Sequence, residues 1–284
     1  MKKISLLSLI IGLTTIQAMA QLTAQEYATG MFRGTRVING QSVETLQEGE
    51  MEFIIAHRFG RINGGGYELF GLDQATIRIG LDYGLNNRLM VGFGRSSQNK
   101  IYDGYVKARL LRQGADNTGF PFSVTAFSSA AATTLRAPSP EEPIPFQSRW
   151  SFANQLLIAR KFTDRFSLQI MPTHIHYNLV DTRMDKNDIF SVGIAGKYQL
   201  TKMWGFTAEY YHNLPNQLPA NRQNSLAIGL DLNTGSHVFQ LHFTNSSAMI
   251  EEAFIGKTTG NWGKGDIHFG FNMVRTFKLK GRRY

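Results

Sequence analysis

From residue 204 to residue 243, apolar residues alternate with polar or small ones. Trp204, Phe206 and Ala208 share one parity of a first segment, and the same period of two returns over 226–233 and 239–244. A period of two places successive side chains on opposite faces of an extended strand. The pattern therefore predicts consecutive antiparallel strands, each with one apolar face.

The alternation continues along almost the whole chain, in segments close to the length that a tilted membrane-spanning strand requires. The predicted strands are 51–60, 74–84, 88–96, 100–112, 120–132, 148–162, 165–180, 187–200, 203–214, 223–233, 236–246 and 265–278. Their connections alternate between short turns and long loops. The short turns are 84–88, 162–166, 200–204 and 233–235, and the loops are 61–73, 133–147, 181–187, 215–222 and 247–264, with 97–99 as a short exception.

This rhythm is typical of an outer-membrane barrel, which has an even number of strands, short periplasmic turns and longer extracellular loops. The predicted fold is all-β: a single antiparallel transmembrane β-barrel of twelve strands over residues 51–284. A soluble β-sandwich or a ligand-binding barrel also alternates, with its apolar face inward. The asymmetric loops and a set of outward aromatics at strand ends favour the membrane barrel. These aromatics are Tyr83, Trp150, Phe162, Tyr177, Tyr198 and Trp204.

The N-terminus indicates export. Two lysines precede an apolar run and a small-residue cleavage pattern, which predicts a signal peptide over residues 1–20. The expected location is the outer membrane of a Gram-negative bacterium, in contact with its lipid. Residues 21–50 then precede the first strand, and they either hang in the periplasm or fold into the lumen as a plug.

Composition narrows the choice of partner. The chain has no cysteine, so burial or lipid must supply the stability that disulfides give many small exported domains. Its formal net charge is +9. In an exported chain, this excess of basic residues favours a small anionic solute or an acidic lipid surface over nucleic acid as the partner.

If the apolar parity faces lipid, the polar parity lines the lumen. Neighbouring strands are expected to form a charge cluster of Arg58, Asp73, Arg78, Asp82, Lys107 and Arg109. The other expected lumen residues are Lys161, His174, His176, Lys197, Glu209, Asp231, His242 and His268. We expect the cluster to fix the first loop and to constrict a pore, and an ion-paired structural lumen is the alternative.

Histidines give no metal site in the sequence. His174 and His176 lie two apart on one strand, but a zinc site needs three or four ligands and no third follows at a recognisable spacing. We expect both to be lumen residues beside Pro172, where the strand would bulge. His57 has the parity of Phe59, so it faces lipid near a rim unless a bulge reverses it. No cofactor is predicted.

Catalysis has little support. Some twelve-stranded barrels hydrolyse lipids through a Ser-His-Asn arrangement on the lipid-facing wall, in which His and Ser lie two residues apart. This chain has no His-x-Ser, and the nearest sequence, 242–244, ends in threonine and points inward. A nucleophile and its base must lie within hydrogen-bond reach. No catalytic residue is predicted.

Several short segments together carry a family resemblance. They are residues 32–44, 57–60, 70–73, 94–97 and 100–103. With them the chain resembles an uncharacterised domain family of predicted outer-membrane β-barrels. The resemblance implies an outer-membrane barrel and supplies no substrate, reaction or site.

The predicted role is a narrow passive channel, or a binding barrel, for a small and anionic solute. The second interpretation is a structural or accessory barrel that serves a periplasmic partner through residues 21–50 and the short turns. The third is an outer-membrane lipid hydrolase.

Overall fold

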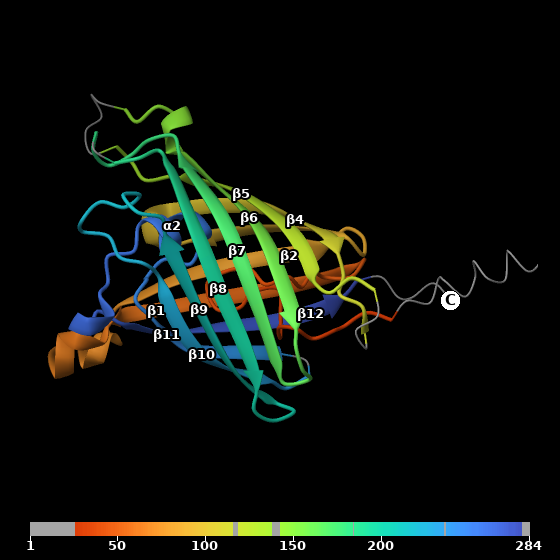
Figure 1. Ribbon diagram of the computed structural model, residues 1–284. Coiled ribbons are helices and arrows are strands. Elements are labelled where there is room, and N and C mark those ends of the chain that lie inside the picture. Colours follow the sequence, from red (N-terminus) through yellow and green to blue (C-terminus); the bar gives the residue numbers. More distant parts are fainter. Residues whose placement is uncertain (1–25, 116–118, 138–142, 184, 236, 280–284) are drawn as a thin grey trace, which may run out of the picture.

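The computed structural model describes residues 26–115, 119–137, 143–183, 185–235 and 237–279. Twelve antiparallel strands close into one barrel in sequence order (Figure 1). They are β1 (Glu50–Arg61), β2 (Ala75–Gly84), β3 (Leu89–Ser96), β4 (Ile101–Leu111), β5 (Ser123–Thr133), β6 (Trp150–Lys161), β7 (Phe166–Tyr177), β8 (Asp188–Gln199), β9 (Trp204–Asn213), β10 (Leu226–Asn233), β11 (His237–Thr244) and β12 (His268–Lys278). The predicted fold and strand number are confirmed. The expected signal peptide lies outside the described residues.

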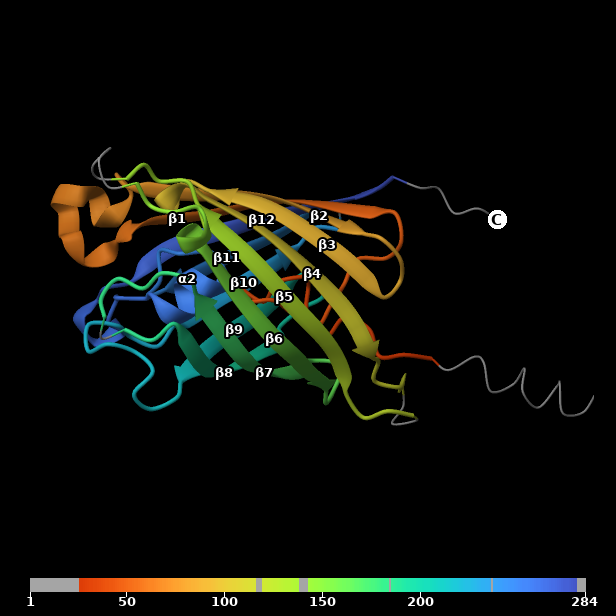
Figure 2. The ribbon, with the colours of Figure 1, turned by 90° about the horizontal axis from the view of Figure 1, so that it is seen from above.

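The barrel has two unlike ends, seen side-on in Figures 1 and 2. At one, called the turn end, short turns join β2 to β3, β6 to β7, β8 to β9 and β10 to β11, and Glu50 of β1 pairs with Lys278 of β12. The other is called the loop end. It carries η1 (Ile62–Gly71), η2 (Gln98–Lys100), η4 (Gln147–Arg149), α2 (Glu251–Gly256) and η5 (Trp262–Lys264). None of the described helices is long and apolar enough to cross a membrane.

Burial alternates along the strands as the period of two predicts. On β1, Ile54 and Arg58 point into the barrel, and Phe53 and His57 point outward. The pairing of β1 with β2 is unbroken past His57, so no bulge reverses its parity. Its ring stacks on Phe271 of β12 at a centroid distance of 5.0 Å. His57 therefore faces outward, which the sequence had left open.

Strand β7 corrects two expectations. Its pairing with β8 runs without a shift through Pro172, because a proline removes one ladder hydrogen bond without inserting a residue. The expected bulge is absent from this strand. His174 and His176 consequently lie on the outer wall, where both rings bond to Asp188 Oδ1, at 2.8 Å and 2.9 Å. The prediction that they line the lumen is wrong, as is the prediction that Tyr177 faces outward, because it is buried inside.

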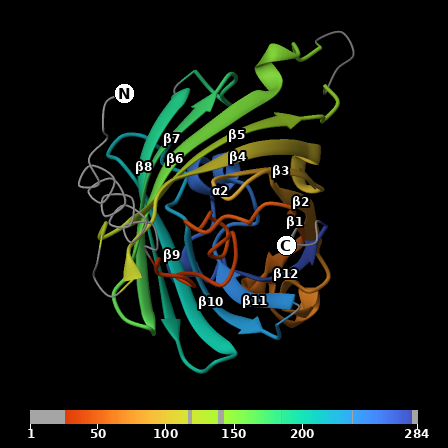
Figure 3. The same ribbon diagram turned by 90° about the vertical axis from the view of Figure 1, so that its right-hand side faces the viewer.

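Two segments fill the lumen, as the view along the barrel in Figure 3 shows. The N-terminal segment, residues 26–49, begins at the turn end, where Tyr27 pairs with Gly114, and from Met31 it runs inside the ring of strands. From the loop end, the inserted loop, residues 246–256, folds into the barrel and carries α2. Apolar side chains of both join the inward residues of the wall in one core. They include Met31, Phe32, Val37, Ile38, Val43, Leu46, Phe254 and Ile255.

Candidate functional site

Charge is distributed unevenly around the lumen wall. We call β9–β12 together with β1–β4 the charged sector, because its inward residues include Glu52, Arg58, Arg78, Asp82, Asp103, Lys107, Arg109, Glu209, Asp231, His242 and His268. We call β5–β8 the uncharged sector. Its inward residues are apolar or uncharged apart from Lys161 and Lys197 near the turn end.

The predicted charge cluster exists in part, on β2 to β4. Arg78 donates two hydrogen bonds to Asp103, and its Nε lies 2.9 Å from Oδ1. Tyr105 and Asp82 pack beside them over Gly92, where a Cβ atom would lie 2.2 Å from the Tyr105 ring and 2.4 Å from Asp82 Oδ1. Glycine is needed at residue 92 because any side chain there would displace these two.

Asp73 is not part of this cluster. It is exposed in the loop after η1, beyond the loop end of the barrel. That loop is held instead by Asp266, which accepts from Arg61 at 3.0 Å and from Asn63 at 2.8 Å. Hydrogen bonds from the Asn261 N–H and from Asn63 hold the pKa of Asp266 below its usual value. The prediction that the charge cluster fixes the first loop is therefore wrong, because the loop extends away from the lumen.

Lumen cations bind the backbone of the N-terminal segment. Lys107 Nζ donates to three of its carbonyl oxygens, those of Thr35 at 3.1 Å, Ser42 at 2.7 Å and Glu44 at 2.5 Å. The other cations make single contacts with this segment: Arg58 with Asn39 Oδ1 at 2.6 Å, Arg109 with the Thr45 carbonyl at 3.1 Å, Lys161 with that of Thr29 at 3.3 Å, and Lys197 with that of Gly30. Five predicted lumen cations thus converge on one segment.

The tip of the N-terminal segment docks on Glu209 of β9. Residues 37–40 form a tight turn, closed by a 2.8 Å hydrogen bond from the Val37 N–H to the Gly40 carbonyl. The Glu209 carboxylate accepts from the backbone N–H groups of Ile38, Asn39 and Gly40 at 3.2, 2.8 and 3.2 Å. Charge-assisted bonds of this kind are stronger than neutral ones. Glu209 is thus the acidic counterpart of Lys107.

Amide side chains complete the hold on this segment. Gln169 of β7 accepts from the Val43 N–H at 2.6 Å and donates to the Gln41 carbonyl at 2.8 Å. Gln240 and Asn272 donate to the carbonyls of Val37 and Ile38 at 2.6 and 2.8 Å. Asp231 and His242 remain on the wall, where they bond to Gln240.

The inserted loop meets both sectors through two adjacent carboxylates. Glu251 forms an ion pair of 3.3 Å with Arg36 of the N-terminal segment, and both side chains are buried. Glu252 points the other way and accepts from Ser129 of β5. Burial, and then repulsion by Glu251, raise the pKa of Glu252 to about 8. Phe254 packs on Tyr211 at a centroid distance of 5.2 Å.

Sequence reasoning missed Arg36, Gln169, Glu251 and Glu252. A signal for the last two was available, since residues 248–250 and 253–255 are apolar inside a segment that was predicted to be an external loop. A loop exposed to water on all sides rarely carries two apolar clusters, because their burial is favourable.

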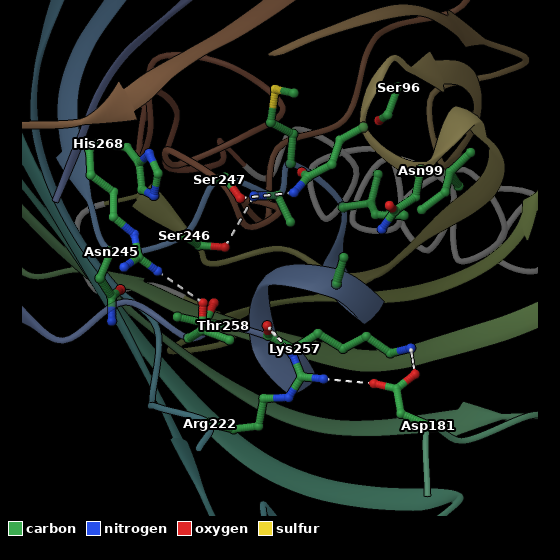
Figure 4. Close-up of a pocket in the computed structure, with 18 residues that line it drawn as sticks. Ser96, Asn99, Asp181, Arg222, Asn245, Ser246, Ser247, Lys257, Thr258 and His268 are labelled. Atoms are coloured by element: carbon green, nitrogen blue, oxygen red, sulfur yellow. Dashed lines mark hydrogen bonds and ion pairs between the residues drawn. The ribbon is translucent and has the colours of Figure 1, made fainter. Parts of the chain in front are cut away.

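A cavity of about 360 Å³ opens at the loop end, above the inserted loop (Figure 4). Residues 246–250 form part of its lining. Its charged lining residues are the cations Arg61, Arg222 and Lys257 and one carboxylate, Asp181. His268 also lines it, and the ring Nδ1 is bonded to the Phe59 carbonyl at 2.8 Å.

Neither a metal site nor a hydrolase site is assembled within the described residues. They hold no group of three or more His, Cys, Asp or Glu side chains placed to bind a metal ion. On the outer wall, Ser128 donates to Asn154 at 2.8 Å, and His174 bonds to Asp188. Within the described part of the chain, no serine hydroxyl is hydrogen-bonded to a histidine ring. The lipid-hydrolase interpretation therefore lacks a nucleophile and base in contact there.

The model of a family described as "membrane bound beta barrel domain (DUF5777)" matches residues 32–277. The chain belongs to this family. The resemblance inferred from the sequence is thereby confirmed. The match includes most of the N-terminal segment as well as the barrel.

Similar solved structures include the NanC porin, with a TM-score of 0.48 and 9% identity over 81% of this chain and 100% of that one. The KdgM porin also has a TM-score of 0.48 and 9% identity, over 80% and 99% of the two chains. An outer membrane channel from Pseudomonas putida F1 has a TM-score of 0.46 and 13% identity, over 83% and 98%. Comparison with curated proteins finds no match.

Proposed function

We propose that this protein is an outer-membrane barrel that passes a small anionic solute when the N-terminal segment leaves the lumen. The turn end faces the periplasm and the outer wall contacts lipid. The observation that carries the proposal is the set of hydrogen bonds by which polar side chains of the wall bind the backbone of residues 26–49, although the segment also contributes six apolar side chains to the core. Exchanging such a hydrogen bond for one to water costs about 0.5–1.5 kcal/mol for a neutral pair and about 1.5–3 kcal/mol where Lys107 or Glu209 is one partner. Water in the lumen can therefore replace the hydrogen bonds of the segment, and the burial of its apolar side chains sets the free energy that its release requires.

The solute path follows the charged sector. Ser96 of β3 lines the loop-end cavity, and Arg78 lies directly across from it on β2, so the cavity leads to the charge cluster. The inward side chains of this sector include acidic and basic groups, so the wall itself discriminates only weakly between anions and cations. The preference for anions comes from the cavity, where three cations accompany one carboxylate.

A second candidate is a closed structural barrel that serves a periplasmic partner. The inserted loop favours it, because Phe254 and Ile255 are fully buried in the same core as Leu157 and Met171. Removing such side chains from an apolar core costs more than exchanging hydrogen bonds with water. In this candidate, neither segment leaves the lumen.

A disulfide lock separates the two candidates. Asn39 Nδ2 lies 3.3 Å from Thr244 Oγ1, and the chain has no cysteine of its own, so Asn39→Cys with Thr244→Cys ties the tip to β11. We expect the reduced protein to conduct ions in planar bilayers and the oxidised protein to be silent. The two single-cysteine variants are the controls and should respond equally to oxidant and reductant.

Equal conductance in both redox states would show that ions do not need the N-terminal segment to move. Silence in both states calls for a release variant, Glu209→Gln with Lys107→Met. If that variant is also silent while trypsin cleaves at Arg33 or Arg36, the lumen stays closed without the segment and the passage proposal fails.

A further inference from the structure

We propose that the loop-end cavity is a binding site for a small polyhydroxylated carboxylate. The inference deepens the proposed function and rests on it only for the role of the site in passage. It is carried by the arrangement of charged, hydroxyl and amide groups in one cavity of about 360 Å³.

The carboxylate position is marked by Asp181. Its Oδ2 accepts from Arg222 Nη2 at 2.7 Å, and its Oδ1 lies 3.6 Å from Lys257 Nζ. A second Arg222 bond, from Nη1 to the Lys257 carbonyl at 2.8 Å, fixes the guanidinium plane (Figure 4). Asp181 itself is half exposed, whereas Arg222 is largely buried. An incoming carboxylate can therefore displace Asp181 from two cations that stay in place.

The rest of the lining is suited to hydroxyl groups. Neutral polar side chains line the cavity around the cations: Ser96, Gln98, Asn99, Asn245, Ser246, Ser247, Thr258 and Thr259. Gln98 and Ser247 are bonded to each other at 2.8 Å. Ser96 is almost fully buried, and its hydroxyl has no hydrogen-bond partner within the described structure. A buried hydroxyl without a partner is costly, which favours a ligand that supplies one.

The volume of the cavity and the groups that line it discriminate among possible ligands. Pockets for small organic ligands have volumes of about 300–1,000 Å³, and this cavity falls within that range. An inorganic anion would occupy the cations and leave the hydroxyl-lined part unfilled. A neutral polyol would satisfy the hydroxyls and leave the cations with Asp181. Only a ligand with both kinds of group uses the whole lining.

The test is calorimetric titration of the purified full chain with D-gluconate. D-sorbitol, which has the same carbon number without the charge, and inorganic phosphate are the comparison ligands. We expect gluconate to bind at least about tenfold more tightly than either, since its complex uses both halves of the cavity.

Two variants with opposite effects identify the site. Arg222→Gln should weaken gluconate binding by about tenfold or more, because a buried carboxylate loses its main partner. Asp181→Asn should strengthen it severalfold, because it removes the carboxylate that competes for the same two cations. A gain in affinity cannot arise from misfolding. Arg183→Gln, an exposed cation of the same loop that does not line the cavity, is the matched control and should change nothing.

The titration is repeated on the oxidised Asn39→Cys, Thr244→Cys protein, whose lumen is locked. Binding to the locked protein supports the cavity even if passage fails. Conductance without gluconate binding overturns the site and leaves passage intact. Equal affinities for gluconate and sorbitol, or an Asp181→Asn variant that binds no better, would also overturn the proposal.

Discussion

The charged and uncharged sectors face each other across one lumen and hold the same two segments differently. On the charged sector, Lys107 and Glu209 bond to backbone groups of residues 35–44. On the uncharged sector, Leu157 and Met171 pack against apolar side chains. Hydrogen bonds can be replaced by water, whereas lost apolar burial costs about 25 cal/mol per Å². Both sectors also contain the other kind of contact, since Gln169 of the uncharged sector bonds to the segment backbone and Tyr211 of the charged sector belongs to the core. Because most of the hydrogen bonds lie on the charged sector, we expect the lumen to open there and the uncharged sector to supply more of the stability.

Two adjacent residues of α2 also differ in the kind of partner that they have. Glu251 faces the charged sector and has a cation, Arg36, as its partner. Glu252 faces the uncharged sector, has a hydroxyl as its partner and a raised pKa. Glu251 thus has a buried cation that balances its charge, whereas Glu252 has only a hydroxyl.

The largest effect is expected from Glu251→Gln. The substitution leaves Arg36 buried without its anion, and breaking a buried pair in this way costs about 3–5 kcal/mol. We expect the inserted loop and the N-terminal segment to separate, which trypsin cleavage near Arg36 would detect. The double variant Arg36→Met, Glu251→Gln should be less affected than Glu251→Gln alone. If the double variant is the more damaged, the pair does not join the two segments as an ion pair.

Leu157→Ala tests the uncharged sector. Leu157 is fully buried in the lumen core, so its truncation should lower the free energy of unfolding by about 2–5 kcal/mol. The neighbouring Leu156→Ala, on the outer face of the same strand, leaves the core intact and should cost less. Urea unfolding in lipid measures both. Equal losses would mean that the interior is not packed as a core.

Glu209→Gln tests the charged sector. The amide keeps one oxygen but loses the charge that three backbone N–H groups share, so docking of residues 37–40 should weaken by about 1–3 kcal/mol. Conductance should rise while unfolding by urea hardly changes. Asp231→Asn is the control, because Asp231 bonds to wall side chains only. A Glu209→Gln protein that loses barrel stability without conducting would reverse the roles of the two sectors.

The smallest effect is a pH dependence that belongs to Glu252. A carboxyl whose pKa is raised by folding contributes stability below its unfolded value, and that stability is lost as the pH rises through about 8. Docking of α2 should therefore weaken as the pH rises from about 5 to about 8 and change little above that, seen as faster protease cleavage of the inserted loop. Glu252→Gln should remove this dependence and strengthen docking at pH 7, because the amide does not have to take up a proton on docking. If Glu252→Gln has the same pH profile as the native chain, the pH dependence belongs to another group.

The sequence predicted the barrel closely. The predicted strands agree with the observed bounds to within three residues, and most inward residues have the predicted parity. His174 and His176 were misplaced because a bulge was assumed at Pro172, where the ladder continues in register. Asp73 was misplaced because charge alone does not say whether a loop folds back over the lumen.

The candidate site was predicted only in outline. Lys107 and Glu209 were recognised as lumen residues, but their partners lie in the N-terminal segment, which has no periodicity. These partners are 63 to 72 positions from Lys107 and 169 to 171 positions from Glu209 in the sequence. The loop-end cavity was not foreseen, because Asp181, Arg222 and Lys257 come from three different loops.

The amino-acid sequence by itself determined the strands, their number and the face that most side chains occupy, because a period of two is a local property of the extended chain. Only the tertiary structure decided what the lumen contains. Barrel closure brings Asn272 of the last strand to Ile38 of the N-terminal segment, 234 positions away. Such contacts depend on how strands stagger around a closed sheet and on which segments enter it, and no local pattern encodes either.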